Sequence, residues 1–136
     1  MADKTKKAIQ LLEGCDSIQL ASINLDGYPR ICEMEVLKFN GLSEIYFTTL
    51  VNSAKVKQYQ SNAKAGVAYS VDYDSVSLVG EVDVVCDMDM KKALWINDHT
   101  RRFVENEDGT PKYCILKFKT VAATFFIDGE KETLAF

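Results

Sequence analysis

The stretch that decides the fold is EIYFTTLVNSAKV at residues 44–56, which changes from one type of secondary structure to another. The β-forming residues and the alternation over 44–49 predict a strand. Asn52 and Ser53 are preferred helix N-cap types. The segment at about 53–62 that follows them has a helical apolar side formed by Val56, Tyr59 and Ala63. We therefore expect a strand that leads directly into a helix.

The polar groups around this helix start predict an anion site. Lys55 falls in the first turn, where the helix dipole disfavours a cation. Thr48, Thr49 and Ser53 place hydroxyl groups next to the same turn. Free backbone N–H groups, hydroxyls and one ammonium can together hold an anion. An incidental lysine on an exposed helix start is the alternative explanation.

A second cation is expected near the same place. Asp26-Gly27 is a strong hairpin signal, and Arg30 follows it on a strand predicted over 28–39. A second signal, Asn40-Gly41, is expected to pair that strand with the one that leads to Thr48. Arg30 would then reach the same anion, and the arginine fork suits phosphate.

The whole chain has the composition of a globular domain. It has 136 residues, of which 47% are hydrophobic and 26% charged, and we expect one domain over residues 1–136. A net charge of −4 argues against nucleic acid as a partner. Without a long apolar run or a signal-peptide pattern, the chain is expected to be cytoplasmic, with no membrane partner and with its four cysteines as free thiols.

The remaining pattern predicts a mainly β fold with short helices. A short amphipathic helix is expected at 3–14. The other predicted strands are 17–25, 65–71, 75–85, 113–118 and 121–127, with a helix beginning at Asp87 or Asp89 and a tail at 129–136. Hairpin-linked strands close into antiparallel barrels or sandwiches, and the long strands favour a small barrel.

Several kinds of chemistry are poorly supported. His99 is the single histidine, and nothing around it has metal-ligand spacing. We expect no metal site. A serine or cysteine nucleophile would also depend on His99, and no nucleophile-elbow, dinucleotide or triphosphate loop motif accompanies it. No catalytic residue can be named from the sequence.

Four short motifs occur in an order that resembles a known family. The chain has D-G-x-P-R at 26–30, Y-F-T-T at 46–49, S-x-K at 53–55 and V-x-L-x-G at 76–80. Together they resemble the FMN-binding split barrels related to pyridoxamine 5'-phosphate oxidase, and most closely the short members called general stress proteins. The resemblance extends over about residues 17–127. It implies a six-stranded antiparallel split β-barrel and a homodimer with FMN bound between the subunits.

The resemblance also implies roles for individual residues. It places Arg30 near the flavin phosphate and ribityl chain, and Ser53 and Lys55 in the phosphate clamp. It places the backbone of one strand beside the isoalloxazine ring, through Ile31, Cys32 and Glu33. The segment of Phe47, Thr48 and Thr49 would contact the flavin and its phosphate, and Ser75 stands where the oxidase has a glutamine that contacts FMN. Cys32 is then either a small packing residue or a redox-active thiol.

Departures from the oxidase pattern oppose pyridoxamine phosphate oxidation itself. Ala54 replaces an arginine of the clamp, Glu35 stands about where a substrate-phosphate lysine is found, and Thr133–Phe136 does not match the oxidase's arginine- and histidine-bearing segment. We expect an FMN flavoprotein that transfers hydride or electrons between a nicotinamide or other donor and a small unknown acceptor. The alternatives are a non-catalytic module that binds flavin, haem or a deazaflavin, and a dimeric structural barrel.

Overall fold

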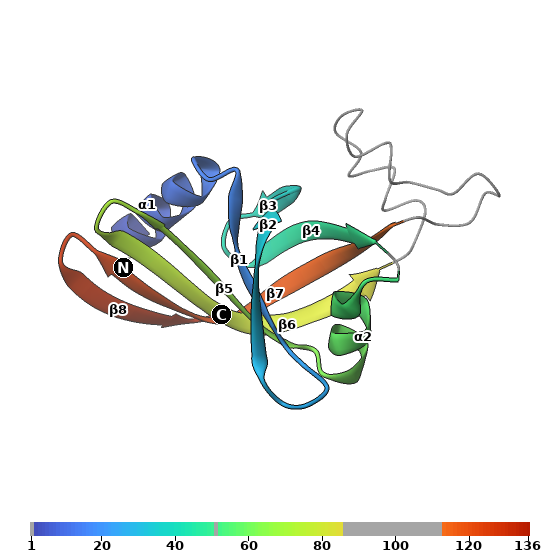
Figure 1. Cartoon of the computed structure of the whole chain (residues 1–136). Helices are drawn as coiled ribbons and strands as arrows, with labels where there is room; N and C mark the ends of the chain where they lie inside the picture. Colours follow the sequence, from blue (N-terminus) through green and yellow to red (C-terminus); the bar gives the residue numbers. More distant parts are fainter. Residues whose placement is uncertain (1, 51, 86–112) are drawn as a thin grey trace.

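The computed structural model describes residues 2–50, 52–85 and 113–136. Figure 1 shows that these residues form a strongly curled sheet with two helices packed against it. The helices are α1 (Ala2–Glu13) and α2 (Ala54–Ser61). The strands are β1 (Ser17–Ile23), β2 (Pro29–Glu35), β3 (Lys38–Asn40), β4 (Glu44–Leu50), β5 (Lys64–Val71), β6 (Asp74–Val85), β7 (Tyr113–Ile127) and β8 (Glu130–Ala135).

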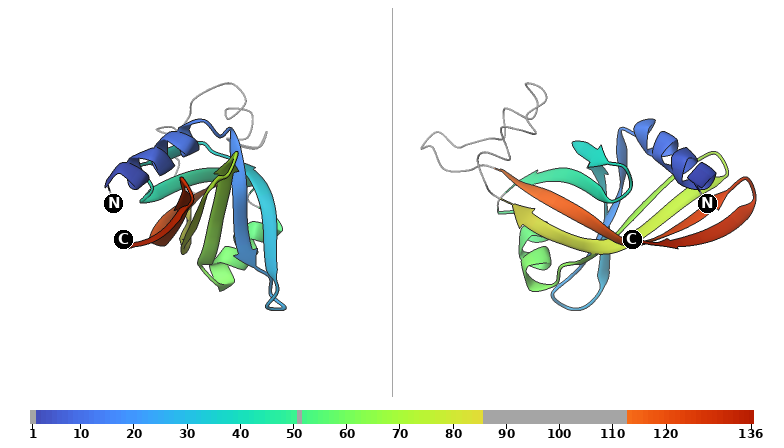
Figure 2. Two further views of the ribbon diagram at one scale, coloured as in Figure 1. Left: turned by 90° about the vertical axis from the view of Figure 1, so that its left-hand side faces the viewer. Right: turned by 180° about the vertical axis from the view of Figure 1, so that it is seen from behind.

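The sheet confirms the predicted mainly β, antiparallel split-barrel class. Its strand order is β2-β1-β5-β6-β7-β4-β3, and β8 pairs with β7. All pairings between the described strands are antiparallel. Figure 2 shows the sheet curling around its own inner face. The described part of the chain has eight strands where the resemblance implied six.

The segment predicted as one strand at 28–39 is two strands with different partners. At the break, the Val36 N–H donates to the Asp16 carbonyl at 3.2 Å and the Leu37 N–H donates to the Tyr46 carbonyl at 2.9 Å. At these two bonds the backbone stops pairing beside β1 and begins to pair with β4. Of these two strands, β3 is the one that pairs with β4, whereas β2, which carries Arg30, pairs with β1. The expected direct pairing of the Arg30 strand with the Thr48 strand is therefore wrong.

The C-terminal part is more regular than the sequence suggested. The two predicted strands at 113–118 and 121–127 are one strand, β7, and the predicted tail contains strand β8. The break expected near 119–120 is instead a shift in register opposite Val79 and Gly80. A long β7 can pair with β4, β6 and β8 along different parts of its length, which a local pattern does not reveal.

The core fills the inner face of the sheet, and α1 covers one end of it. Ala8 and Leu12 of α1 are fully buried. The Tyr69 hydroxyl donates to the Ala8 carbonyl at 2.8 Å. The largest fully buried side chains are Phe47, Phe118, Phe125, Leu12, Ile18, Leu20, Ile45, Leu78, Ile115 and Leu116.

The described cysteines differ in whether their thiols are free. Cys15 and Cys32 are free thiols, as expected. Cys114 is disulfide-bonded, so the expectation of a free thiol is wrong there. Disulfide pairing depends on which distant segments adjoin, and no C-x-x-C spacing marks it locally.

The helix predicted from Asp87 or Asp89, together with His99, lies outside the described residues. No helix in the described part of the chain is long and apolar enough to span a membrane.

Candidate functional site

The junction of β4 and α2 brings together three of the predicted anion ligands. Ser53 is the N-cap, with extended backbone angles, and its side chain makes no cap hydrogen bond. Instead, the Thr49 hydroxyl donates to the Ser53 hydroxyl oxygen at 2.9 Å. Lys55 follows in the first turn, which contains no acidic residue. The first-turn N–H groups of a helix have no partner within the helix, so this turn suits an anion.

Helix α2 is attached to β1 by buried polar contacts. The Ser22 hydroxyl donates to Gln58 Oε1 at 2.6 Å, and Gln58 Nε2 donates to Asn24 Oδ1 at 2.8 Å. The Tyr59 hydroxyl donates to the Ala21 carbonyl at 3.0 Å. Burial raises the pKa of Tyr59, so this phenol stays protonated and able to donate. These contacts hold the helix against the second half of β1.

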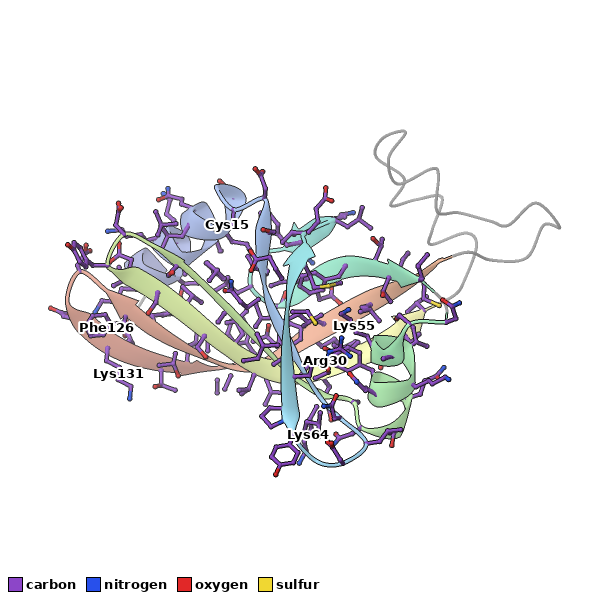
Figure 3. The ribbon with its side chains drawn as sticks, viewed as in Figure 1. Cys15, Arg30, Lys55, Lys64, Phe126 and Lys131 are labelled. Atoms are coloured by element: carbon purple, nitrogen blue, oxygen red, sulfur yellow. The ribbon has the colours of Figure 1, made fainter. Side chains whose placement is uncertain are left out.

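Arg30 lies on the strand next to this attachment point. It is directly opposite Ser22 in the β1–β2 ladder, and Ser22 is bonded to α2. In the one direction of view of Figure 3, Arg30 and Lys55 both project onto the region between β2 and α2. The meeting of the two cations stays a prediction. Any link between them runs through β1, because β2 does not pair directly with β4.

The other predicted residues of β4 divide between two faces. Successive residues of a strand face opposite sides of the sheet. Phe47 is fully buried in the core, and Thr49 shares its side of the strand. Thr48 lies on the opposite side, opposite Ile115 of β7 in the ladder. Only one of the two threonines is thus placed with Ser53.

The predicted residues of β2 divide in the same way. Cys32 is half-buried, opposite Leu20, on the side of the strand that carries Arg30. Ile31 and Glu33 lie on the other side and are exposed. The Glu33 carboxylate accepts hydrogen bonds there from Ser17 Oγ and Gln19 Nε2, at 2.7 Å and 2.5 Å. Cys32 therefore lies on the same side of β2 as Arg30. Ile31 and Glu33 lie on the outer face of the sheet, which is the side away from the core.

Ser75 is not brought to the other predicted ligands within one copy of the chain. It is exposed on β6, close to the β5–β6 turn, and pairs with Phe126. Figure 3 shows Phe126 and Lys55 at opposite ends of the molecule. A contact of Ser75 with the same ligand would require a second copy.

Gln58 was missed by the sequence reasoning, although a signal existed. It lies between Val56 and Tyr59, which form the buried side of α2, and it is only 6% exposed. A glutamine within the apolar side of a helix is unusual, because buried polar groups need hydrogen-bond partners. The partners themselves, Ser22 and Asn24, could not be found without the fold.

The outer face of the sheet has two hollows, of which the first has no charged residue in its lining. A hollow of about 270 Å³ is lined on β2, β1, β5 and β6 by Ile31, Gln19, Ala21, Gly66, Val67, Ala68, Ser77, Leu78 and Val79. A second hollow of about 430 Å³ adjoins Val79 and is lined by Val121, Ala65, Gly80, Lys64 and Glu81. Within the described residues, no group of three or more side chains is placed to hold a metal ion.

The whole chain matches a family model. The model, described as pyridoxamine 5'-phosphate oxidase like, matches residues 3–136. The chain belongs to this family. The match confirms the family resemblance seen in the motifs at 26–30, 46–49 and 53–55.

Solved structures share the fold of this pyridoxamine 5'-phosphate oxidase-like chain. A protein related to general stress protein 26, from Clostridium acetobutylicum, has a TM-score of 0.86 at 21% identity, over 100% of this chain and 96% of the other. A pyridoxamine 5'-phosphate oxidase-related, FMN binding protein from Nostoc punctiforme has a TM-score of 0.72 at 16% identity, over 99% and 94%. A heme binding protein from Mycobacterium smegmatis has a TM-score of 0.77 at 10% identity, over 97% and 57%. No curated protein matches the sequence.

Proposed function

We propose that this protein binds FMN and acts as a flavin-dependent oxidoreductase on a small molecule. The observation that carries the proposal is the hydrogen bond between the Thr49 and Ser53 hydroxyls at the helix turn that carries Lys55. Arg30 of β2 is opposite Ser22, which is bonded to the same helix, and this arrangement supports a shared role for the two cations. Two cations, two hydroxyls and the free N–H groups of a helix turn are a donor set that fits a phosphate. Membership of the oxidase-like family and the FMN-binding neighbour support the choice of flavin.

The residues of the chain would bind and orient the flavin. Arg30 and Lys55 would hold the phosphate, and Cys32, on the same side of β2 as Arg30, would lie along the path toward the ring. When bound, FMN supplies hydride and electron transfer. Glu35 opposes a phosphorylated substrate, because a carboxylate repels phosphate. The acceptor is therefore proposed to be a small molecule other than pyridoxamine phosphate.

A titration of the purified protein with FMN tests the phosphate site. Loss of a charge-assisted hydrogen bond costs roughly 1.5–3 kcal/mol, so Lys55→Ala should weaken FMN binding by roughly tenfold to a hundredfold. Lys57→Ala is the matched control, since Lys57 is exposed on the same helix and two positions away from Lys55. Flavin fluorescence measures both. Equal affinity of wild type and Lys55→Ala would contradict the assigned phosphate site, and no saturable binding by wild type would contradict FMN.

Turnover is tested separately from binding. The FMN-loaded protein is mixed with NADH or NADPH without oxygen, and flavin absorbance is followed. Bleaching faster than that of free FMN supports an oxidoreductase. No reduction would instead support the alternative of a non-catalytic flavin module. The absorption spectrum of the protein as purified also distinguishes flavin from haem.

We further propose that the protein is a homodimer that pairs through its outer sheet face, with the flavin site at the subunit interface. Ile31, Val79 and Val121 are 67%, 54% and 53% exposed on or beside the two hollows. Phe125 and Phe126 are consecutive in β7 and face opposite sides of the sheet, so Phe125 is buried and Phe126 is 46% exposed. Exposed apolar area of this kind marks association surfaces.

An oligomeric-state measurement tests the dimer. Val79→Asp places a charge in the middle of the outer face and should convert the dimer to a monomer, because an unpaired charge at an interface core is costly. Val71→Asp, on an exposed position near the β5–β6 turn, is the control. Light scattering that shows a monomeric wild type, or a dimeric Val79→Asp, would contradict the proposed interface.

A further inference from the structure

A buried polar chain lies behind the proposed phosphate site and connects its two cations. Gln58 is three residues after Lys55, so the two side chains lie on the same side of α2. Gln58 accepts from Ser22, and Ser22 is directly opposite Arg30 in the β1–β2 ladder. The helix that carries Lys55 is therefore linked to the neighbour of Arg30 by one side-chain hydrogen bond, between Ser22 and Gln58.

The bond between Ser22 and Gln58 is buried, and both ends of the Gln58 amide have hydrogen-bond partners. Ser22 and Gln58 are 4% and 6% exposed, and they are the buried polar residues of the described part of the chain. The second end of the Gln58 amide donates to Asn24. A buried amide left without a partner is costly, so the bonds permit one position of α2 on β1.

Little else within α2 specifies that position. The helix has eight residues, its N-cap hydroxyl makes no cap bond, and its first turn carries no acidic residue. Val56 and Tyr59 contribute apolar contact, which resists sliding less than a bonded amide does. The Tyr59 hydroxyl adds one bond, to the Ala21 backbone. Ser22 and Gln58 are thus the side-chain pair that sets where Lys55 lies relative to Arg30.

We infer that Gln58 and Ser22 are positioning residues that set the preference of this protein for a phosphorylated flavin over riboflavin. The inference rests on the proposed FMN site and extends it to residues that do not touch the phosphate. Gln58 holds α2, α2 carries Lys55, and Ser22 anchors the same contact beside Arg30. A small displacement of α2 separates the two cations, which weakens their joint hold on one phosphate. In this proposal the ring would be held by residues outside α2, so a displacement of the helix would leave riboflavin binding unchanged.

The test compares FMN with riboflavin, which has no phosphate, in Gln58→Leu and in the matched control Gln60→Leu, an exposed position of the same helix. Gln58→Leu should weaken FMN binding about tenfold and change riboflavin binding less than about twofold. Gln60→Leu should change neither. In a Lys55→Ala background, Gln58→Leu should have no further effect on FMN binding, because the cation that it positions is absent. Ser22→Ala, a smaller change, should shift the same ratio in the same direction.

Several results would overturn the inference. An equal loss of FMN and riboflavin affinity would show a merely structural role, and unchanged FMN affinity in a folded Gln58→Leu would show no role. Amide hydrogen exchange provides a readout that requires no flavin: exchange across α2 should become faster in Gln58→Leu and stay unchanged in Gln60→Leu. If wild type binds no flavin, the proposed function fails, and the exchange experiment still decides the positioning. Equal exchange in the two variants would then refute it.

Discussion

Replacing Gly80 with alanine tests the packing of β6 against β7, the pair with the most extensive ladder. A Cβ at Gly80 would lie 2.0 Å from the Lys119 carbonyl oxygen and 2.9 Å from its carbonyl carbon. Real Cβ contacts are essentially never shorter than 3.0 Å, so the backbones must separate by about 1 Å. The obstacle is backbone, which cannot rotate away as a flexible side chain does.

Gly80→Ala lowers the free energy of unfolding because the separation of the two backbones disturbs the β6–β7 ladder. Gly80 pairs with Thr120 at the shift in register, so a displacement of about 1 Å weakens ladder hydrogen bonds on both sides, each worth about 1 kcal/mol. Overpacking strain adds about 1–3 kcal/mol. We expect Gly80→Ala to lower the free energy of unfolding by about 3 kcal/mol. For a domain of this size, the Tm should fall by roughly 10 °C.

Urea and thermal unfolding followed by circular dichroism measure this loss, with Gly66→Ala as the matched control. A Cβ at Gly66 would lie 3.7 Å from both the Ala21 Cβ and the Leu78 carbonyl oxygen, which is ordinary contact. Gly66→Ala should be neutral or stabilise by up to about 1 kcal/mol, since alanine restricts the unfolded chain. The reasoning is refuted if the Tm of Gly80→Ala stays within about 2 °C of wild type, or if Gly66→Ala is equally damaging.

Two further predictions concern the attachment of α1 to the sheet. The pKa of Asp74 is held below its ordinary value by the backbone N–H of Asp128 and by Lys7, so the associated stability is present at neutral pH and is lost as the pH falls below about 4. Lys7→Ala should therefore reduce the loss of stability between pH 6 and pH 3, measured by urea unfolding, and the control Lys6→Ala should not. Equal pH dependence in both variants would contradict the role of Lys7 in lowering the pKa of Asp74. Tyr69→Phe should lower the free energy of unfolding by about 1 kcal/mol in the same assay, because its hydroxyl donates to a backbone carbonyl of α1, and an unchanged value would show that the bond contributes nothing.

The sequence by itself determined the local elements and the kinds of ligand group. The hairpin signals at 26–27 and 40–41 form turns in which Gly27 and Gly41 have φ of 91° and 57°, a region that glycine adopts at no steric cost. The helix after Ser53 begins at Ala54, and Lys55 lies in its first turn. Turn preference, helix capping and alternation depend on neighbouring residues, so a single sequence expresses them.

Only the tertiary structure decided which segments meet. In the structure β2 pairs with β1 and β3 pairs with β4, and Ser22, opposite Arg30, is hydrogen-bonded to Gln58 of α2. The tertiary structure also turned the tail into β8 and buried Gln58. Strand partners are distant in sequence, and alternation specifies only the two faces of a strand, not the partner or register. Partner and register are selected by the burial and hydrogen bonding of the whole sheet. The sequence could therefore name candidate phosphate ligands by residue type, but it could not give the contacts that connect their strands and helix.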